Sequence, residues 1–287
     1  MRRLIVNADD FGLTPGVNRA IAEAHRGGVV TCSTLMATGA AFSDAVSVAR
    51  SLPRLAVGCH VLLVDGRPVL STEQIPDLVD RASPGQFHTT LGSFARRAVM
   101  GKIKPEQIEA EAAAQIRKLQ AAGIAVSHLD THKHTHILPQ VLRPLLRAAR
   151  ICGVKAVRNP FERLNVSLVA GSPKLWRQFG KLFLLRGLGG GFRAEVRRAG
   201  LATCEGSIGI ITTGFLDPVL LRRMIDSLPE GTWELVCHPG YNDSALDQVK
   251  TRLRESRAAE LRILTSEETR QLLGQNGIEL ISYRDLG

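Results

Sequence analysis

The sequence predicts an α/β fold, a distorted TIM-like barrel of six or seven parallel strands with the helices on its outer side. Two observations support this prediction. Short and almost continuously apolar segments alternate with helical ones about six or seven times within 287 residues, and such strands are typical of parallel sheets that helices cover. Polar residues also cluster directly after several of these strands, where the active sites of barrel enzymes lie.

The first part of the chain contains clear start and stop signals. Thr14-Pro15 supplies an N-cap and a proline at the first helical position, and Gly123 follows a helix with an apolar stripe. Residues 64–104 lack periodicity and contain prolines, so we expect them to form an excursion over one face. The predicted elements are strands over 4–6, 29–38 and 55–62 and helices over 15–27, 41–51 and 105–122.

The second part of the chain repeats the same alternation. A capping box at Thr265-Ser266-Glu267-Glu268 opens the last helix. No linker divides the chain, so we predict one catalytic domain over residues 1–287. The other predicted elements are strands over 124–130, 154–157, 208–211, 233–237 and 278–281 and helices over 140–152, 218–227 and 245–261.

Hydrophobic patterning and cysteine usage indicate a cytoplasmic protein. Charge, Gly or Pro interrupts every apolar run before it is long enough to span a bilayer, and the N-terminus reaches polar residues too soon for a signal peptide. The five cysteines show no CxxC spacing, so we expect neither a disulfide framework nor a thiolate zinc site.

More than half of the net charge of +10 comes from one segment. Residues 161–200 carry eight basic and two acidic side chains, interleaved with Trp, Phe and Leu. This pattern is typical of a basic amphipathic helix and predicts peripheral association with an anionic membrane, at its inner face. The alternative is an ordinary helical insertion with a solvated basic face. We expect no nucleic-acid partner, because no nucleic-acid-binding motif accompanies the charge.

Two strand ends in the first third of the chain carry polar residues. Asp9 and Asp10 follow the first strand, and adjacent side chains of an extended chain point to opposite sides, so the two carboxylates can have different roles. The pair could instead cap a helix. His60 closes the third strand, where a buried structural histidine is the alternative to a functional one.

The segment 128–136 holds four of the eight histidines of the chain together with one carboxylate. If the strand stays extended, His128, Asp130, His132, His134 and His136 share one face and can converge on one point. Imidazoles and a carboxylate suit a catalytic zinc or a related divalent ion, which uses about three protein ligands. The remaining histidines would orient the ligands or bind substrate.

A fourth strand end places His238 before a Pro-Gly turn. A histidine in this position suits a general acid or base that works opposite the carboxylates.

Together these segments resemble the YdjC family of carbohydrate deacetylases. The resemblance rests on Asn-Ala-Asp-Asp-Phe-Gly at 7–12, Gly-Cys-His at 58–60, His-Leu-Asp-Thr-His-Lys-His-Thr-His at 128–136 and Cys-His-Pro-Gly at 237–240. These motifs occur in the order of the family and spread over most of the chain. The resemblance implies a polysaccharide-deacetylase-like barrel that uses a metal ion to remove N-acetyl groups from amino sugars, with release of acetate.

Site residues follow from the resemblance position by position. Asp10, His60 and His132 match the metal ligands of the family, Asp9 matches its catalytic base, and His238 matches its proposed acid. The bound metal would be one divalent ion, with zinc the best match to this ligand set and magnesium or another divalent ion as the alternative.

Further polar residues are expected to support this set or to bind substrate. Asp130 would orient a histidine ligand, and Arg158 would support the carboxylates or contact the substrate. Asn7, His128, His134 and His136 belong to the same group. Thr131 and Lys133 depart from the residues that many members of the family carry, which leaves substrate contacts in this loop open.

The basic segment and the residues of the 128–136 motif resemble those of the hopanoid-biosynthesis-associated branch of the family. The expected substrate is therefore an acetylated amino sugar attached to a lipid, such as an N-acetylglucosaminyl hopanoid. Three alternatives stay open: a deacetylase for soluble chitooligosaccharides, a metal-dependent phosphoesterase and a non-catalytic sugar-binding barrel. A phosphoesterase would need more carboxylate ligands or a basic phosphate cradle near the motifs.

Overall fold

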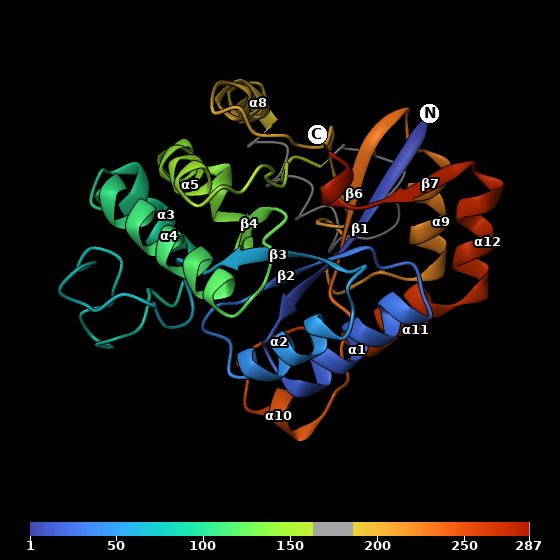
Figure 1. The fold of residues 1–287 in the computed structure, drawn as a ribbon, viewed down its shortest axis with the longest axis horizontal. Coiled ribbons are helices and arrows are strands. Elements are labelled where there is room, and N and C mark those ends of the chain that lie inside the picture. Colours follow the sequence, from blue (N-terminus) through green and yellow to red (C-terminus); the bar gives the residue numbers. More distant parts are fainter. Residues whose placement is uncertain (163–185, 287) are drawn as a thin grey trace.

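The computed structural model describes residues 1–162 and 186–286. Its centre is a parallel sheet in the order β4-β3-β2-β1-β6-β5, with β7 also paired to β1 (Figure 1). The fold class predicted from the sequence is confirmed. The strands in the described residues are β1 (Arg2–Phe11), β2 (Cys32–Leu35), β3 (Ala56–Val61), β4 (Leu129–Thr131), β5 (Gly206–Ile208), β6 (Gly231–Cys237) and β7 (Ile278–Ile281).

The long strand β1 is the centre of the sheet. Its first half, Arg2 to Ile5, lies between β6 and β7, and its second half pairs with β2. The residues of β1 from Leu4 to Phe11 are all buried, because strands that are covered on both faces expose neither set of side chains. The carboxyl end of β1 therefore lies deep inside the molecule.

An irregular segment spans the gap between the two edges of the sheet. Single parallel bridges join Val157 to Leu129 of β4 and Glu162 to Ser207 of β5. The regular strand predicted over 154–157 is therefore wrong, since only isolated bridges form there. These bridges bring β4 and β5 to the two sides of one segment, so the strands form a distorted half-barrel whose two edges are joined only by isolated bridges.

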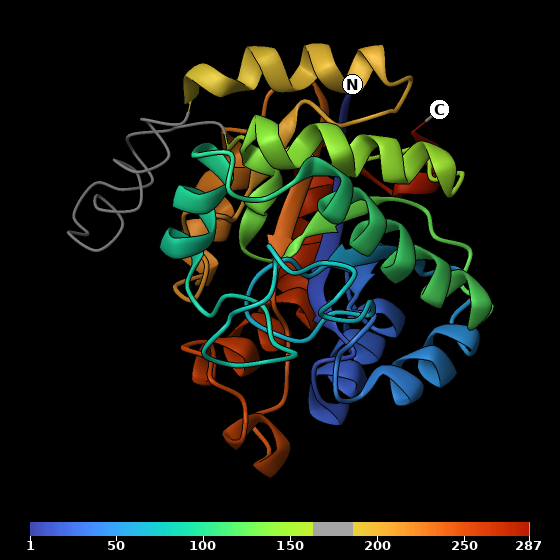
Figure 2. The same ribbon diagram turned by 90° about the vertical axis from the view of Figure 1, so that its left-hand side faces the viewer.

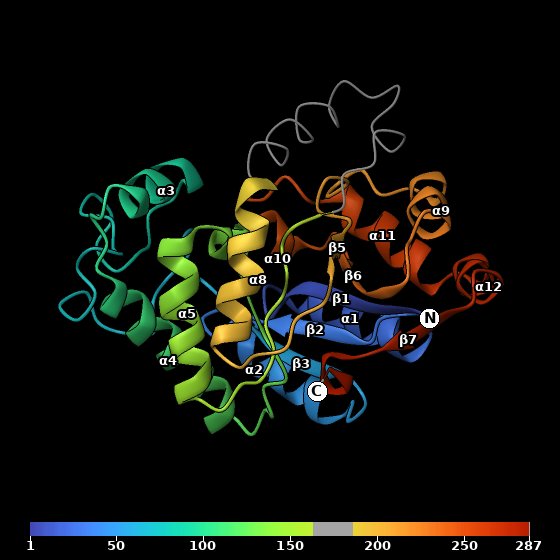
Figure 3. The same cartoon turned by 90° about the horizontal axis from the view of Figure 1, so that it is seen from above.

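Helices surround the strands. Figures 2 and 3 both show α4, α5 and α8 side by side on the outside of the strands, and α1, α2 and α11 lie on the opposite side. The α-helices of the described residues are α1 (Pro15–Arg26), α2 (Phe42–Arg50), α3 (Leu91–Val99), α4 (Pro105–Ala121), α5 (Pro139–Ile151), α8 (Gly189–Arg198), α9 (Pro218–Asp226), α10 (Ser244–Asp247), α11 (Glu255–Thr265) and α12 (Glu267–Gln275).

Several predicted boundaries differ from the structure. The helix predicted over 245–261 is divided into α10 and α11, because the chain between them turns inward to line a cavity. The excursion over 64–104 contains one regular helix, α3. The strand predicted over 29–38 is regular only in β2, and the last helix is capped by Ser266, whose hydroxyl accepts the Thr269 N–H.

The basic segment predicted over 161–200 falls mostly on residues 163–185, which lie outside the described residues. Its last part is α8, whose Phe192 and Val196 are buried. Within the described residues, no helix has both the length and the apolar character that crossing a membrane requires.

Gly58 lies at a point where the barrel interior is so tightly packed that even a methyl side chain would clash. A Cβ atom at Gly58 would lie 2.5 Å from Cε1 of His128, whose ring stacks on Tyr283 with centroids 3.8 Å apart. Because neither ring has room to move, we expect Gly58→Ala to lower the free energy of unfolding by about 1–3 kcal/mol, measured by urea denaturation. Gly274→Ala in α12 is the matched control. Its Cβ meets no described atom within 4 Å, so a comparable loss there would contradict the packing argument.

The buried carboxyl group of Glu162 is expected to make the free energy of unfolding depend on pH. Its buried carboxylate accepts the Gly209 and Ile211 N–H groups at 2.9 and 2.6 Å, but burial raises its pKa from 4.5 to about 7. Between these values the folded protein holds more protons than the unfolded chain, so the free energy of unfolding falls as pH rises, by up to about 3 kcal/mol.

Glu162→Gln removes the titrating group. Its amide oxygen can accept one of the two backbone N–H groups and its nitrogen neither, so the variant is expected to be less stable overall, and the slope of its stability with pH is the readout. We expect the variant to show a flatter stability profile than the wild type when urea denaturation is compared at about pH 5 and about pH 7.5. Parallel profiles for the two proteins would show that Glu162 does not titrate in this range.

Candidate active site

The barrel interior is organised around the guanidinium of Arg158, which is fully buried. It forms a two-point ion pair with Asp9 at 2.6 and 2.8 Å and contacts Asp130 and Glu234 as well. Burial disfavours the charged guanidinium, but Asp130, Asp9 and Glu234 outweigh this effect and hold the pKa of Arg158 well above its usual value. Residues from β1, β4 and β6 are thereby tied to the irregular segment that closes the barrel.

Further hydrogen bonds hold the Asp9 carboxylate in one orientation. The side-chain amide of Asn7 donates to Asp9 Oδ1 at 2.9 Å, and its carbonyl oxygen lies 3.1 Å from Nε2 of His128. Burial raises the pKa of Asp9, but Arg158, His60 and His238 reverse this effect and hold the pKa well below its usual range. Asp9 is therefore an ionised carboxylate at neutral pH.

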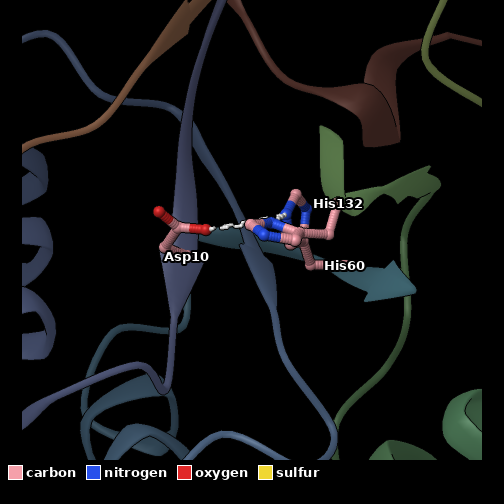
Figure 4. A group of neighbouring side chains, drawn as sticks. All are labelled: Asp10, His60 and His132. Carbon is pink, nitrogen blue, oxygen red and sulfur yellow. Dashed lines mark hydrogen bonds and ion pairs between the residues drawn. The ribbon is translucent and has the colours of Figure 1, made fainter. Parts of the chain in front are cut away.

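Three side chains at strand ends point toward one another in Figure 4. Asp10 comes from β1, His60 from β3 and His132 from the turn after β4. His60 Nε2 lies 3.2 Å from His132 Nδ1, and Asp10 Oδ1 lies 3.7 and 3.6 Å from these two nitrogens. Bonds of about 2.0–2.1 Å in a tetrahedral zinc site place ligand atoms about 3.3 Å apart. The three atoms therefore fit one small divalent cation.

The local field also favours a positive charge between these atoms. His60 donates from Nδ1 to Asp130 Oδ1 at 2.8 Å, which leaves Nε2 directed at Asp10 and His132. Burial lowers the pKa of His60, but Asp130, Asp9 and Asp10 outweigh it and raise the pKa to about 9. Burial lowers the pKa of His132 to about 4, so its ring is neutral and has a lone pair to donate.

The backbone at Asp10 has a left-handed conformation, with φ of 66°. Such a conformation is uncommon outside glycine and marks a position that the surrounding structure determines. Arg257 of α11 donates to Asp10 Oδ2 at 2.5 Å, so Oδ1 is the oxygen that faces the two histidines. Burial raises the pKa of Asp10, but Arg257 and the nearby histidines hold it below its usual value.

His238 follows β6 and lines the same cavity. Its Nε2 lies 3.9 Å from Asp9 Oδ2. Of the two Asp9 oxygens, Oδ1 accepts from Arg158 and Asn7, whereas Oδ2 accepts only from Arg158 among the described residues. A carboxylate oxygen has two lone pairs, so Oδ2 keeps one available toward His238.

The histidine-rich segment does not remain extended as predicted. β4 ends at Thr131, and the chain continues as a 3-10 helix, η1 (His132–Ile137), in which Lys133 and His134 have positive φ values of 55° and 52°. The prediction of one shared face is therefore wrong beyond His132. His134 lines the cavity, whereas His136 turns away and binds the backbone carbonyl of Arg158 at 3.2 Å.

These groups open into a cavity of about 790 Å³. Its floor carries the carboxylates and histidines, and its rim carries Lys133, Lys250 and Arg252. A cavity of this size accommodates a sugar with part of an attached group. Its apolar wall is aliphatic and consists of Leu13, Met36, Leu62, Leu91, Ile210, Val249 and Leu253.

Sequence reasoning missed several residues that hold this site. Glu234 contacts Arg158 and accepts a hydrogen bond from the Tyr283 hydroxyl at 2.7 Å. A glutamate inside an apolar strand was a signal that could have identified it. Arg257 and Glu260 lie on α11, far from every motif in sequence, and no local pattern distinguishes them from surface charges.

The chain is similar to known proteins over almost its whole length. The chain matches the YdjC-like protein family over residues 3–275. It is 32% identical to a carbohydrate deacetylase of Brevibacillus brevis, over 99% of this chain and 100% of the relative. It is also 31% identical to a carbohydrate deacetylase of Vibrio cholerae, over 99% of this chain and 96% of the relative.

A solved structure shows the same fold. A protein of Enterococcus faecalis, assigned as a candidate cellobiose-phosphate cleavage protein, superimposes with a TM-score of 0.75 and 29% identity. The alignment covers 98% of this chain and 97% of that protein. The match over almost the whole length and the shared fold lead to one conclusion: the chain belongs to the YdjC-like family.

Proposed function

We propose that the chain is a metal-dependent carbohydrate deacetylase that hydrolyses the N-acetyl group of an amino sugar and releases acetate. The observation that carries the proposal is the arrangement of two groups in one cavity. Asp10, His60 and His132 present three ligand atoms within 4.8 Å of one another, and Asp9 and His238 lie beside them. Membership of the family and the names of its curated relatives support the same activity.

Asp10, His60 and His132 would hold the ion, and Asp130 would fix the ring of His60. When bound, a divalent ion supplies Lewis acidity that polarises an amide carbonyl and acidifies a water molecule. Two nitrogen ligands and one carboxylate match zinc best, and magnesium or another divalent ion is the alternative. Three protein ligands are also the number that a catalytic zinc ion would use.

Asp9 would act as the general base. Its carboxylate is ionised and held by Arg158 and Asn7, and the remaining lone pair of Oδ2 faces the cavity. It can therefore accept a proton from an attacking water molecule without changing its orientation. Such a positioned base contributes a factor on the order of 10²–10⁴ in rate.

His238 would act as the general acid. Amide hydrolysis expels an amine, which is a poor leaving group unless it receives a proton as the carbon–nitrogen bond breaks. Nε2 of His238 lies 3.9 Å from Asp9 Oδ2, and His238 lines the same cavity as the ligand set. The two proton-transfer groups can therefore address the two sides of one acetamide.

The ligand set can be tested by metal content. We expect His60→Ala and His132→Ala each to bind zinc at least about 100-fold more weakly than the wild type, since losing a ligand costs more than losing an outer partner. Metal analysis after purification without chelator, followed by zinc titration, measures this. His134→Ala is the control, because it removes a cavity histidine outside the ligand set. A full equivalent of metal in either ligand variant would contradict the assignment.

For the substrate we propose a lipid-linked sugar, such as an N-acetylglucosaminyl hopanoid. The aliphatic wall of the cavity supports an apolar group beside the sugar, and the apolar, basic composition of residues 161–200 supports a peripheral approach to an anionic membrane. A deacetylase for soluble chitooligosaccharides is the second candidate. This candidate is supported by the names of the curated relatives, which specify a carbohydrate and no lipid.

The geometry gives less support to the two other candidate functions, a non-catalytic sugar-binding barrel and a metal-dependent phosphoesterase. A non-catalytic sugar-binding barrel has no need of an ionised Asp9 and a facing His238. The basic rim of the cavity, Lys133, Lys250 and Arg252, is a feature that a phosphoesterase could use, but a two-metal phosphoesterase also needs a second carboxylate-rich site. The other group with metal-like spacing in the described residues is Asp9, His60 and Asp130, and Arg158 already contacts two of its members.

Acetate release distinguishes the substrates. We expect the wild type to release acetate faster from an N-acetylglucosaminyl lipid in anionic vesicles than from acetylated chitooligosaccharides, and Asp9→Asn to bind both without turnover. Higher salt should weaken binding to anionic vesicles, because charges beyond a Debye length of about 8 Å are screened. Equal or faster acetate release from the soluble sugars would reject the lipid proposal, and phosphate release from phosphosugars without acetate release would reject the deacetylase.

A further inference from the structure

Helix α11 brings two charged side chains into the molecule one turn apart. Arg257 and Glu260 are only 1% and 2% exposed, and their i, i+3 spacing places them on one face of the helix. Arg257 contacts Asp10, as described above. Glu260 is used by neither the ligand set nor the proposed proton transfers, although burying a carboxylate is costly unless it has partners.

Glu260 fixes the chain at the proposed acid. Its Oε2 accepts the backbone N–H of His238 at 2.6 Å. One turn earlier, the carbonyl oxygen of Arg257 accepts the Gly240 N–H at 3.2 Å. These two bonds attach residues 238–240 to α11 and determine where the His238 side chain begins.

Three buried polar atoms around His238 have no hydrogen-bond partner among the described residues: Nδ1 of His238, Oε1 of Glu260 and Nη1 of Arg257. The hydroxyl of Ser256 on α11 lacks a partner as well. Buried polar atoms are nearly always paired, directly or through an ordered water molecule. The Arg257 nitrogen can only donate and the Glu260 oxygen of a carboxylate can only accept. The three atoms therefore complement one another if Nδ1 of His238 carries a proton.

The two faces of the His238 ring have different surroundings. Nε2 lies 3.9 Å from Asp9 Oδ2, whereas Nδ1 is buried and has no partner among the described residues. Burial raises the pKa of Glu260, while the charges of His238 and Arg257 and the His238 N–H act in the opposite direction. A ring with its proton on Nδ1 presents Nε2 to the substrate as the nitrogen that gains and loses the transferred proton.

We propose that Glu260 is a positioning residue that holds the proton of His238 on Nδ1 through one bridging water molecule, since Oε1 of Glu260 and Nδ1 of His238 make no direct hydrogen bond, and so keeps Nε2 directed at the cavity. The functional meaning of this arrangement rests on the proposed deacetylase activity. The arrangement itself does not, because the position of the proton is measurable in a protein that turns nothing over.

Glu260→Gln gives a sharp test of the proton position. The amide oxygen can still accept the His238 N–H, but the amide nitrogen then replaces Oε1 as a donor. A bridging water that accepts from this amide nitrogen is free to donate to Nδ1, and the negative charge that favoured a proton there is gone, so we expect the neutral ring of His238 to change from the Nδ1–H to the Nε2–H tautomer. Nitrogen-15 NMR of the histidine-labelled, zinc-loaded protein reports the tautomer, and His238→Gln assigns the signal. An unchanged tautomer in Glu260→Gln would overturn the proposal.

Kinetics separate positioning from a purely structural role. We expect Glu260→Gln to lower kcat about 10–100-fold, a part of the contribution of a general acid, while KM and zinc affinity change less than about threefold. In a His238→Asn background, which has no acid to position, Glu260→Gln should have no further effect. Additive losses in the two backgrounds would show that Glu260 only supports the fold.

Glu255→Gln is the matched control, because it makes the same substitution at an exposed position of α11. It should leave the tautomer, kcat and zinc affinity at wild-type values. If the wild type deacetylates neither the lipid nor the soluble sugars, the proposed function fails, and the tautomer of Glu260→Gln still decides the role of Glu260.

Discussion

The buried Arg158 guanidinium is the constraint on which the rest of the structure depends. It gathers Asp9, Asp130 and Glu234 from three strands, and Asp130 in turn contacts His60 at 2.8 Å. An ion pair of this kind adds little net stability compared with apolar packing, but removing one partner typically costs about 3–5 kcal/mol. Its value is specificity, because only one arrangement of β1, β4, β6 and the closing segment places three carboxylates around one guanidinium.

Three other buried glutamates near the cavity also bind segments that are distant in sequence. Glu111 of α4 accepts the Val69 and Leu70 N–H groups, Glu162 accepts those of Gly209 and Ile211, and Glu260 accepts that of His238. Each carboxylate satisfies backbone donors in a segment without regular structure, where no ladder is available to do so. The cavity rim is therefore held by side chains that are distant in sequence, and its shape does not depend on the strands alone.

The sequence predicted those parts of the site that local rules determine. Apolar strands that end at Asp9, His60 and His238 must converge, because the carboxyl ends of parallel strands share one edge. The turn after Thr131 could not be predicted, because Lys133 and His134 adopt positive φ without being glycine or asparagine, and only tertiary contacts make that possible. The contact between Arg257 and Asp10 could not be predicted from the sequence either, because the two residues are 247 positions apart. Local patterns describe strands and helices, whereas the partners of buried charges are set by the complete fold.

The register of the sheet explains why these contacts are possible at all. His60 of β3 lies directly beside Asp130 of β4, and Ala8 of β1 lies beside Cys237 of β6. The first pairing brings the imidazole to the carboxylate that fixes it, and the second places His238 next to Asp9, one residue further along both strands. A slip of one residue would turn either member of each pair to the opposite face. The same backbone ladder that orders the barrel therefore also aligns the ligands with the proton-transfer groups.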